Sequence, residues 1–240
     1  MIRPQSENGF IPTMNHYGYM LEKPDQYSQA FIDYAISIRG RVLDIGAAYG
    51  VSTIPALRGG AYVIANDLDE RHLMILKERV PSSFLNNLIL MPGKFSRDIS
   101  IRNNSLDAVL ASGVLHYLEG DELEDAFVKI FRILKPGGKF FFFTSTPYIK
   151  LFRKFLPIYK TRKIRGLKWP GLIEDVWIYA PERQGNLPKM INLLDMETLL
   201  NLLNQTGFEI EKSSYVEMIG YPPDIHSDGR EYIGTIAIKP

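Results

Sequence analysis

Short apolar runs alternate along this chain with longer stretches in which apolar residues recur at helical spacing. The short runs have the length of buried strands and lie at 41–45, 61–65, 88–91, 106–111 and 139–144. Helical spacing occurs at 25–36, through Ile54 and Leu57, at 70–80 and at 121–134. Strands that alternate with helices form βαβ units. The pattern therefore predicts an α/β fold with a mainly parallel sheet and helices on both faces.

The C-terminal part of the chain extends this sheet. Asp195 is placed to cap a helix from Met196 to about Gln205, and Gly207 is placed to end it. Two further strands are predicted at 208–216 and 232–238. We therefore predict seven strands, of which the last two form an antiparallel pair.

Two segments fall outside the alternation. Residues 1 to about 20 lack periodicity, and a helix is predicted to begin at Pro24 or Asp25, so residues 1–24 are interpreted as an irregular N-terminal arm. Residues 146–190 show no regular alternation and are interpreted as an insertion after the fifth strand, in a single domain that spans 1–240. The aromatic residues of the arm either fold over a ligand or cover the edge of the sheet.

Composition excludes several kinds of chemistry. The 240 residues contain no cysteine, which rules out disulfides, thiolate nucleophiles and cysteine-bound metals. The four histidines are scattered without ligand spacing, so we expect no metal site. The formal net charge is +1, which argues against a dedicated nucleic-acid-binding protein. No apolar run approaches the roughly 18 to 20 residues that span a bilayer, and we expect a cytoplasmic location.

The insertion carries a segment rich in basic residues. Between Lys150 and Lys168 there is no acidic residue, and aromatic residues alternate with lysines and arginines. Three interpretations stay open at this point. The segment is a lid over a ligand pocket, a contact surface for an anionic partner or a membrane, or a solvated face.

A glycine-containing turn follows the first strand of the alternation. Asp44-Ile-Gly46-Ala-Ala-Tyr-Gly50 joins that strand to a helix, and small residues in such a turn let the backbone approach a ligand closely. The second strand ends at Asp67, where a carboxylate can accept hydrogen bonds from both hydroxyls of a ribose. The turn alone is weak evidence, but together with Asp67 it predicts a nucleotide-type site.

The charge of the turn favours one class of cofactor. Dinucleotide sites need GxGxxG, so that a helix N-terminus faces a pyrophosphate, and this spacing is absent here. A carboxylate at Asp44 would repel a pyrophosphate. It suits S-adenosylmethionine, which carries an ammonium and a sulfonium.

Several motifs together resemble the class I S-adenosylmethionine-dependent methyltransferases. The segment 42–50 resembles their first motif, Asp67 their second, 104–118 their fourth strand with the turn after it, and 133–142 the entry to their fifth strand. The resemblance covers about 25–145 and resumes at about 190. It implies a Rossmann-like sheet, S-adenosylmethionine as the cofactor and S-adenosylhomocysteine as the product.

The resemblance implies a role for each matching position. Asp67 would hold the ribose, and Leu68 would pack on the adenine face. The other implied contacts lie in the first turn and after the third and fourth strands: Asp44, Gly46, Ala47 and Ala48 toward the methionine end, Gly50 as a further cofactor-binding residue of the same turn, Lys94 and Phe95 at the adenine edge, and Ser112, Gly113 and Val114 closing the methionine side.

The chain departs from the family's pattern at two positions. Ala48 stands where a glycine is usual, which is tolerable if its φ is negative. Lys94 stands where the family often has an aspartate that accepts from the adenine amino group, and lysine cannot accept a hydrogen bond. These departures leave open a weakened cofactor site.

The acceptor is not identified by the sequence. We expect methyl transfer to a small molecule at oxygen or nitrogen, with His116 as a general base or, alternatively, as a packing residue of the turn. A non-catalytic partner-binding or regulatory module on the same fold is the alternative. An aminopropyl transferase is disfavoured because no acidic polyamine pocket is evident. Nucleic acid is disfavoured as the acceptor because the chain has no NPPY-type motif and no cysteine.

Overall fold

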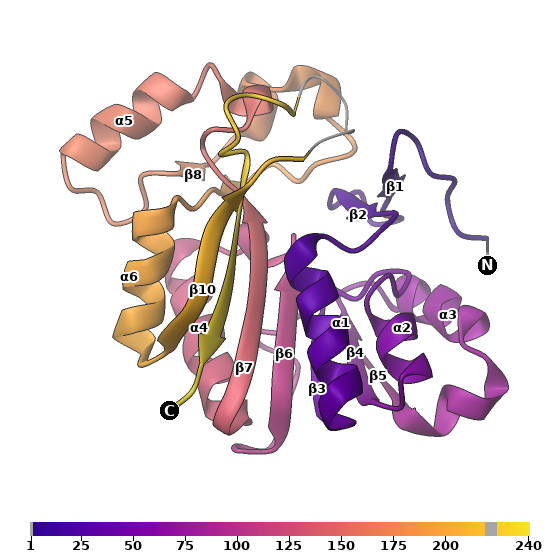
Figure 1. Cartoon of the computed structure of the whole chain (residues 1–240). Coiled ribbons are helices and arrows are strands. Elements are labelled where there is room, and N and C mark those ends of the chain that lie inside the picture. The colour runs from indigo at the N-terminus through magenta and orange to yellow at the C-terminus, as the bar shows by residue number, and fades with distance from the viewer. Residues whose placement is uncertain (1, 219–224) are drawn as a thin grey trace.

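A seven-stranded sheet forms the centre of the protein in the computed structural model, which describes residues 2–218 and 225–240 (Figure 1). The strand order is β10-β11-β7-β6-β3-β4-β5. The parallel strands are β3 (Arg41–Ile45), β4 (Tyr62–Asp67), β5 (Leu88–Pro92), β6 (Leu106–Ser112) and β7 (Leu134–Ser145). β11 (Tyr232–Ile238) is antiparallel both to β7 and to β10 (Glu209–Val216). The predicted Rossmann-like sheet with an antiparallel end pair is confirmed.

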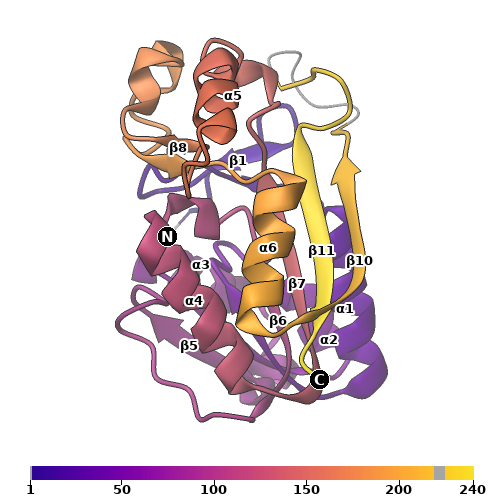
Figure 2. The same cartoon turned by 90° about the vertical axis from the view of Figure 1, so that its left-hand side faces the viewer.

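Helices cover both faces of the sheet because apolar side chains point alternately to its two sides. Along β7, Phe141 and Phe143 pack in the core under α1 (Gln26–Ile38), α2 (Thr53–Arg58) and α3 (Glu70–Arg79). Phe140 and Phe142 pack on the opposite face, which α4 (Gly120–Ile133) and α6 (Met196–Thr206) cover (Figure 2). Neighbouring residues of one apolar run thus serve two separate cores.

Helix ends follow the capping residues that the sequence contains. Asp25 caps α1 by accepting from the backbone N–H groups of Tyr27 and Ser28, and Asp195 caps α6 by accepting from Thr198. Gly207 ends α6 in the left-handed conformation, with φ of +98°. These predicted helix boundaries are confirmed, and Asp25 rather than Pro24 marks the start of α1.

The Pro136-Gly-Gly138 stretch, whose residues are typical of a turn, lies inside a strand. β7 begins at Leu134, which pairs with Leu106, and the register shifts between Leu106 and Ala108. Gly137 has a φ of +75° and donates its N–H to Lys239, so Pro136-Gly-Gly138 forms an irregular stretch of the strand instead of a separate turn. The structure also gives the segment before β5 a short 3-10 helix at Ser82–Asn87.

The N-terminal arm is not irregular, contrary to expectation. β1 (Phe10–Pro12) and β2 (Tyr19–Leu21) pair as an antiparallel hairpin. Ile11 and Met20 are buried from opposite strands and cluster with Tyr49 of the glycine turn. This contact, which the local pattern did not reveal, gives the arm an apolar side and holds it on the domain.

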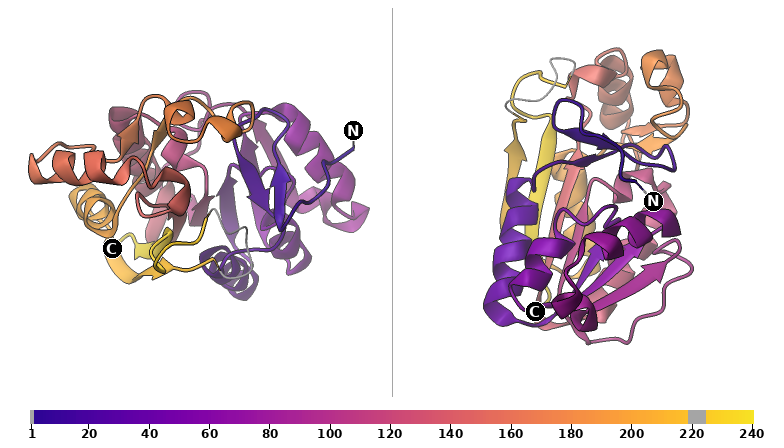
Figure 3. Two further views of the ribbon diagram at one scale, coloured as in Figure 1. Left: turned by 90° about the horizontal axis from the view of Figure 1, so that it is seen from above. Right: turned by 90° about the vertical axis from the view of Figure 1, so that its right-hand side faces the viewer.

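The insertion contains one α-helix and a two-stranded pair. α5 (Leu156–Ile164) follows a 3-10 turn at Lys150–Phe152, and β8 (Leu172–Ile173) pairs with β9 (Ile191–Asn192). Arm and insertion lie together above the carboxyl ends of the parallel strands (Figure 3). The Gly18 N–H donates to the Asn186 carbonyl at 2.8 Å, which joins them directly.

Candidate functional site

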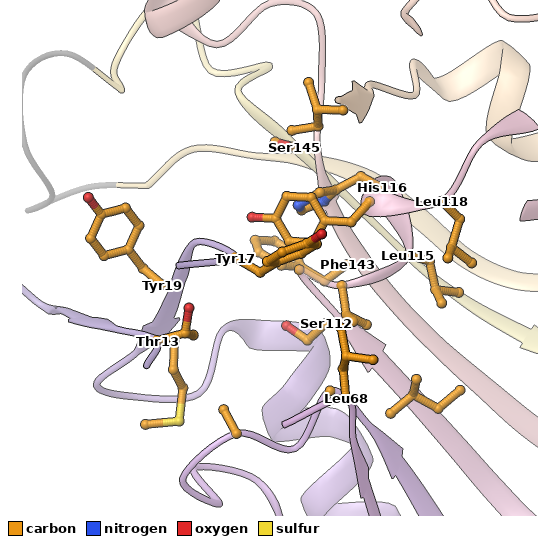
Figure 4. A pocket seen from close by; sticks show the side chains of 18 of the residues that line it. Thr13, Tyr17, Tyr19, Leu68, Ser112, Leu115, His116, Leu118, Phe143 and Ser145 are labelled. Atoms are coloured by element: carbon orange, nitrogen blue, oxygen red, sulfur yellow. The ribbon is translucent and has the colours of Figure 1, made fainter. Parts of the chain in front are cut away.

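A large cavity of about 1090 Å³ lies at the carboxyl ends of the parallel strands, and arm and insertion contribute to its wall (Figure 4). Ligand crevices of open α/β sheets lie at this edge. The predicted positions that line it are Asp44, Gly46, Ala47, Ala48, Asp67, Leu68, Lys94, Phe95, Ser112, Gly113, Val114 and His116. Residues from four separate strand ends are thus brought together, as predicted.

Gly50 is the predicted position that does not line the cavity. Its φ is +85°, and a Cβ added there would lie 2.9 Å from Cγ of Leu76. The glycine is needed for the conformation of the turn and for close packing on α3. Gly50 therefore shapes the turn from outside the cavity lining, and its contact with a cofactor stays a prediction.

Asp44 is a buried carboxyl that lines the cavity. Its Oδ2 accepts a hydrogen bond from Thr53 Oγ1 at 2.7 Å. Burial raises the pKa of Asp44 to about 7, the hydrogen bond from Thr53 lowers it, and the nearby Asp67 raises it further. A carboxyl in this state ionises most easily when a cation binds beside it, which fits the ammonium of a methionine moiety.

Asp25 is a second carboxyl in the cavity wall, and the sequence pattern identified it only as a helix cap. It is 8% exposed and accepts hydrogen bonds from Ser28 and from Ser112 Oγ, the latter at 2.9 Å. The contact to Ser112 ties the start of α1 to the end of β6. Asp25 and Asp44 thus line the same cavity, together with Asp67 and Glu122.

Asp67 has partners on both carboxylate oxygens. Oδ2 accepts from the Ala48 N–H at 2.9 Å, while Oδ1 accepts from the Asp69 N–H at 2.9 Å and lies 3.0 Å from His72 Nδ1. A carboxylate offers about four acceptor positions. Three partners therefore orient the group and leave one position for a ligand hydroxyl.

His72 joins Asp67 to the N-terminal arm, and sequence reasoning did not single it out. The ring is 1% exposed, and its Nε2 accepts from the Met14 N–H at 3.0 Å. Because Nε2 accepts, Nδ1 of the neutral ring carries the proton and donates to Asp67. The Tyr49 hydroxyl also accepts from Met14 N–H and lies 3.1 Å from the Pro12 carbonyl. In the sequence, the only sign of this contact was that His72 follows Asp67 by five residues and lies in the first turn of α3.

Ala48 has a φ of +44°, so the condition under which its methyl group would be unstrained is not met. An L-residue in this left-handed region places Cβ too close to the backbone, at a cost of roughly 1 kcal/mol. The Ala48 N–H nevertheless donates to Asp67. The turn thus keeps the conformation that a glycine would adopt freely.

Lys94 forms an ion pair inside the cavity wall. Its Nζ lies 2.6 Å from Oε1 of Glu122, and Ser96 Oγ donates to the same carboxylate at 2.7 Å. Burial would raise the pKa of Glu122, but the hydrogen bonds from Lys94 and Ser96 outweigh it and lower the pKa. Glu122 lies in the first turn of α4 and provides, beside Lys94, an ionised hydrogen-bond acceptor, which a lysine cannot be. Sequence reasoning did not identify Glu122.

His116 lies at the end of β6, in a short helical turn at Leu115–Tyr117, and faces the cavity (Figure 4). Nδ1 lies 2.8 Å from Thr144 Oγ1, and no hydrogen bond engages Nε2 within the described ranges. Burial lowers the pKa of His116 to about 3. The imidazole is therefore neutral at physiological pH and can accept a hydrogen bond, but the same burial makes it a weaker base than an exposed histidine.

The part of the cavity around His116 is lined mainly by aromatic side chains. Tyr17 of the arm packs edge-to-face on Tyr117, with ring centroids 5.9 Å apart, and Phe143 stacks on Tyr232 at 5.1 Å. All four residues line the cavity.

In the part of the chain that the structure describes, no group of acidic or histidine side chains is arranged to hold a metal ion.

The fold and this cavity define a Rossmann-like α/β domain with a nucleotide-type ligand site. A family model described as a methyltransferase domain matches residues 43–142. A solved S-adenosylmethionine-dependent methyltransferase from Methanosarcina mazei shares the fold, with a TM-score of 0.62 and 21% identity over 83% of this chain and 92% of that chain. The segment 43–142 is thus similar to a methyltransferase domain, and the chain shares the fold of a solved S-adenosylmethionine-dependent methyltransferase.

The similarity to curated relatives covers only part of each relative's length. Phosphoethanolamine N-methyltransferase 1 of Triticum aestivum is 30% identical over 100 residues, which are 42% of this chain and 20% of that protein. Demethylmenaquinone methyltransferase of Clavibacter sepedonicus is 27% identical over 170 residues, which are 70% of this chain and 65% of that protein. The chain thus spans less than two thirds of either relative.

Proposed function

We propose that the chain binds S-adenosylmethionine in the large cavity and transfers its methyl group to a small-molecule acceptor at oxygen or nitrogen. The observation that carries this proposal is the size and division of the cavity. Pockets for a single drug-sized ligand measure roughly 300 to 1000 Å³, and this cavity of about 1090 Å³ exceeds that range. It has room for a cofactor beside the carboxyls and for an acceptor among the aromatic rings.

The side chains present fit the cofactor. Asp44 and Asp25 face the cationic methionine end, and Asp67 takes the ribose. Leu68, which is 51% exposed, offers an apolar surface to the adenine, and Glu122 provides the acceptor for its amino group in place of the family's aspartate. When bound, S-adenosylmethionine supplies an electrophilic methyl group. The chain positions the two reactants and excludes water, which accounts for much of the rate in such displacements.

The decisive experiment is isothermal titration of the whole chain with S-adenosylmethionine and with S-adenosylhomocysteine. We expect micromolar binding of both. Binding would justify a screen of phenols, amines and carboxylates as acceptors. Absence of heat with either compound would contradict the proposal and favour a non-catalytic partner-binding module, with Ala48 as the first suspect.

His116 is proposed as the general base of the transfer. A base at Nε2 requires that Nδ1 carry the proton and donate to Thr144 Oγ1. His116→Ala is expected to lower kcat at least about a hundredfold, while the affinity for S-adenosylmethionine measured by titration stays unchanged. Because burial lowers the pKa of His116 to about 3, wild-type kcat should not fall between pH 8 and pH 5 through loss of this base. An unaltered kcat in the variant would leave His116 as a packing residue.

A further inference from the structure

The outer face of the insertion exposes aliphatic side chains on a well-anchored helix. Ile164 is 87% exposed, Leu167 45% and Ile158 40%. On the inner side Phe155 and Tyr159 are each 1% exposed. The burial of these aromatic rings fixes α5 in one orientation, so the aliphatic side chains are held outward by the fold.

Basic side chains alternate with these aliphatic residues. Arg153, Lys154, Lys160 and Arg165 are exposed, and within residues 2–218 and 225–240 none of them forms an ion pair. Lys163 and Lys168 differ, because Lys163 pairs with Asp195 and Lys168 pairs with Glu124. The uncompensated positive charge is thus concentrated on the same outward face as the aliphatic side chains.

We propose that this outer face, formed by Arg153, Lys154, Ile158, Lys160, Ile164, Arg165 and Leu167, docks on a membrane surface that contains anionic lipids. Exposed aliphatic residues enter the boundary between head groups and acyl chains, while lysine and arginine side chains meet the lipid phosphates. The helix lies on the surface and does not cross it. Its length of nine residues is too short to span a bilayer, and no described helix is long and apolar enough to do so.

Two other occupants fit the same face less well. Single-stranded RNA is held by aromatic side chains that stack on bases, whereas the exposed apolar residues here are Ile158, Ile164 and Leu167, and Phe155 and Tyr159 are buried. A second copy of the chain, paired face to face by a two-fold axis, would set two uncompensated positive surfaces against each other. An anionic bilayer satisfies both the charge and the aliphatic side chains.

The docking face and the cavity are built on one continuous segment. Leu151 and Phe152, just before the outer face begins, line the cavity. α5 itself lies at the end of the molecule beyond the carboxyl ends of the strands (Figures 1 and 2). A membrane that contacts α5 therefore lies on the same side of the domain as the cavity.

The test is sedimentation of the whole chain with phosphatidylcholine vesicles and with vesicles that contain about one third phosphatidylglycerol. We expect binding to the anionic vesicles only, and weaker binding at high salt. Lys154→Glu with Lys160→Glu, and separately Ile164→Asp, should each weaken binding about tenfold or more. Lys77→Glu on α3 and Val128→Asp on α4, both exposed, are the matched controls and should bind as the wild type does.

Several outcomes would overturn the proposal. These are equal binding to both kinds of vesicle, no binding to either, and an equal loss in the control variants. If the wild type bound no vesicles but shifted the electrophoretic mobility of poly-uridine, and the lysine variants did not, the face would be assigned to RNA. A dimer that Ile164→Asp dissociates would assign it to a second copy. Circular dichroism of each variant shows whether the fold is kept, and none of these readouts depends on cofactor binding.

Discussion

Asp44 is a carboxyl that the fold holds in an unfavourable environment. Its pKa is raised to about 7 by burial, compared with 3.8 for an ordinary aspartate. The folded chain therefore keeps a proton between these values where the unfolded chain releases it, and stability falls as pH rises through this window. This cost is offset only when a cation binds.

Asp44→Asn should for this reason stabilise the protein and weaken cofactor binding together. We expect the free energy of unfolding in urea to rise by on the order of 2 kcal/mol at pH 8, and the gain to disappear near pH 4. The affinity of the wild type for S-adenosylmethionine should increase from pH 6 to pH 7.5, and that of the variant should be low throughout. Equal stability of both proteins at pH 8 would contradict the raised pKa.

His72 has two hydrogen bonds that substitution can separate. An asparagine side chain places its amide near the position of Nδ1 and keeps a donor for Asp67, while a glutamine reaches the position of Nε2 and keeps an acceptor for Met14. His72→Gln should weaken binding of S-adenosylmethionine about tenfold, the value of one hydrogen bond to a charged group. His72→Asn should keep most of the affinity but speed hydrogen exchange at the Met14 amide. Identical behaviour of the two variants would show that the ring acts only by packing.

At the scale of the element, the glycine turn after β3 carries the strain of Ala48. Ala48→Gly removes a methyl group from a left-handed position and should raise the melting temperature by a few degrees, because roughly 1 kcal/mol of strain exceeds the added flexibility of the unfolded chain. Ala47 is the matched control, since its φ is not positive. Ala47→Gly should lower the melting temperature. A decrease in both variants would show that the strain at Ala48 is negligible.

At the scale of the whole molecule, arm and insertion meet above the cavity. A Cβ added at Gly18 would clash with the Tyr117 hydroxyl, so only glycine lets the arm pack this closely on Tyr117. A Cβ added at Gly185 would meet nothing within 4 Å. The two glycines have nearly equal φ values, +90° and +86°, and thus nearly equal backbone strain on substitution.

Gly18→Ala should therefore displace the arm while Gly185→Ala should not. We expect Gly18→Ala to weaken binding of S-adenosylhomocysteine at least about tenfold, because the arm covers the cavity and excludes water. Gly185→Ala should lose a similar amount of stability and retain its affinity. The measurement is titration calorimetry with melting curves of both variants. Equal affinity in both would mean that the arm covers the sheet edge without contributing to the site.

The sequence by itself determined the order of strands and helices, the caps of α1 and α6, and the glycine turn with Asp44 and Asp67. These features depend on local spacing, since apolar runs, capping residues and turn residues act within a few positions of the chain. For the same reason, all but one of the predicted site positions line the cavity. The exception, Gly50, matches the motif but lies outside the cavity lining and packs closely against Leu76.

Only the tertiary structure decided which distant residues complete the site. Glu122 reaches Lys94 from α4, Asp25 reaches Ser112 from the start of α1, and Met14 of the arm meets His72. The hairpin of the arm could not be predicted either, because Ile11 and Met20 form an apolar cluster only together with Tyr49, which lies far away in the sequence. Contacts across tens of residues depend on how the elements pack, and no local pattern encodes that packing.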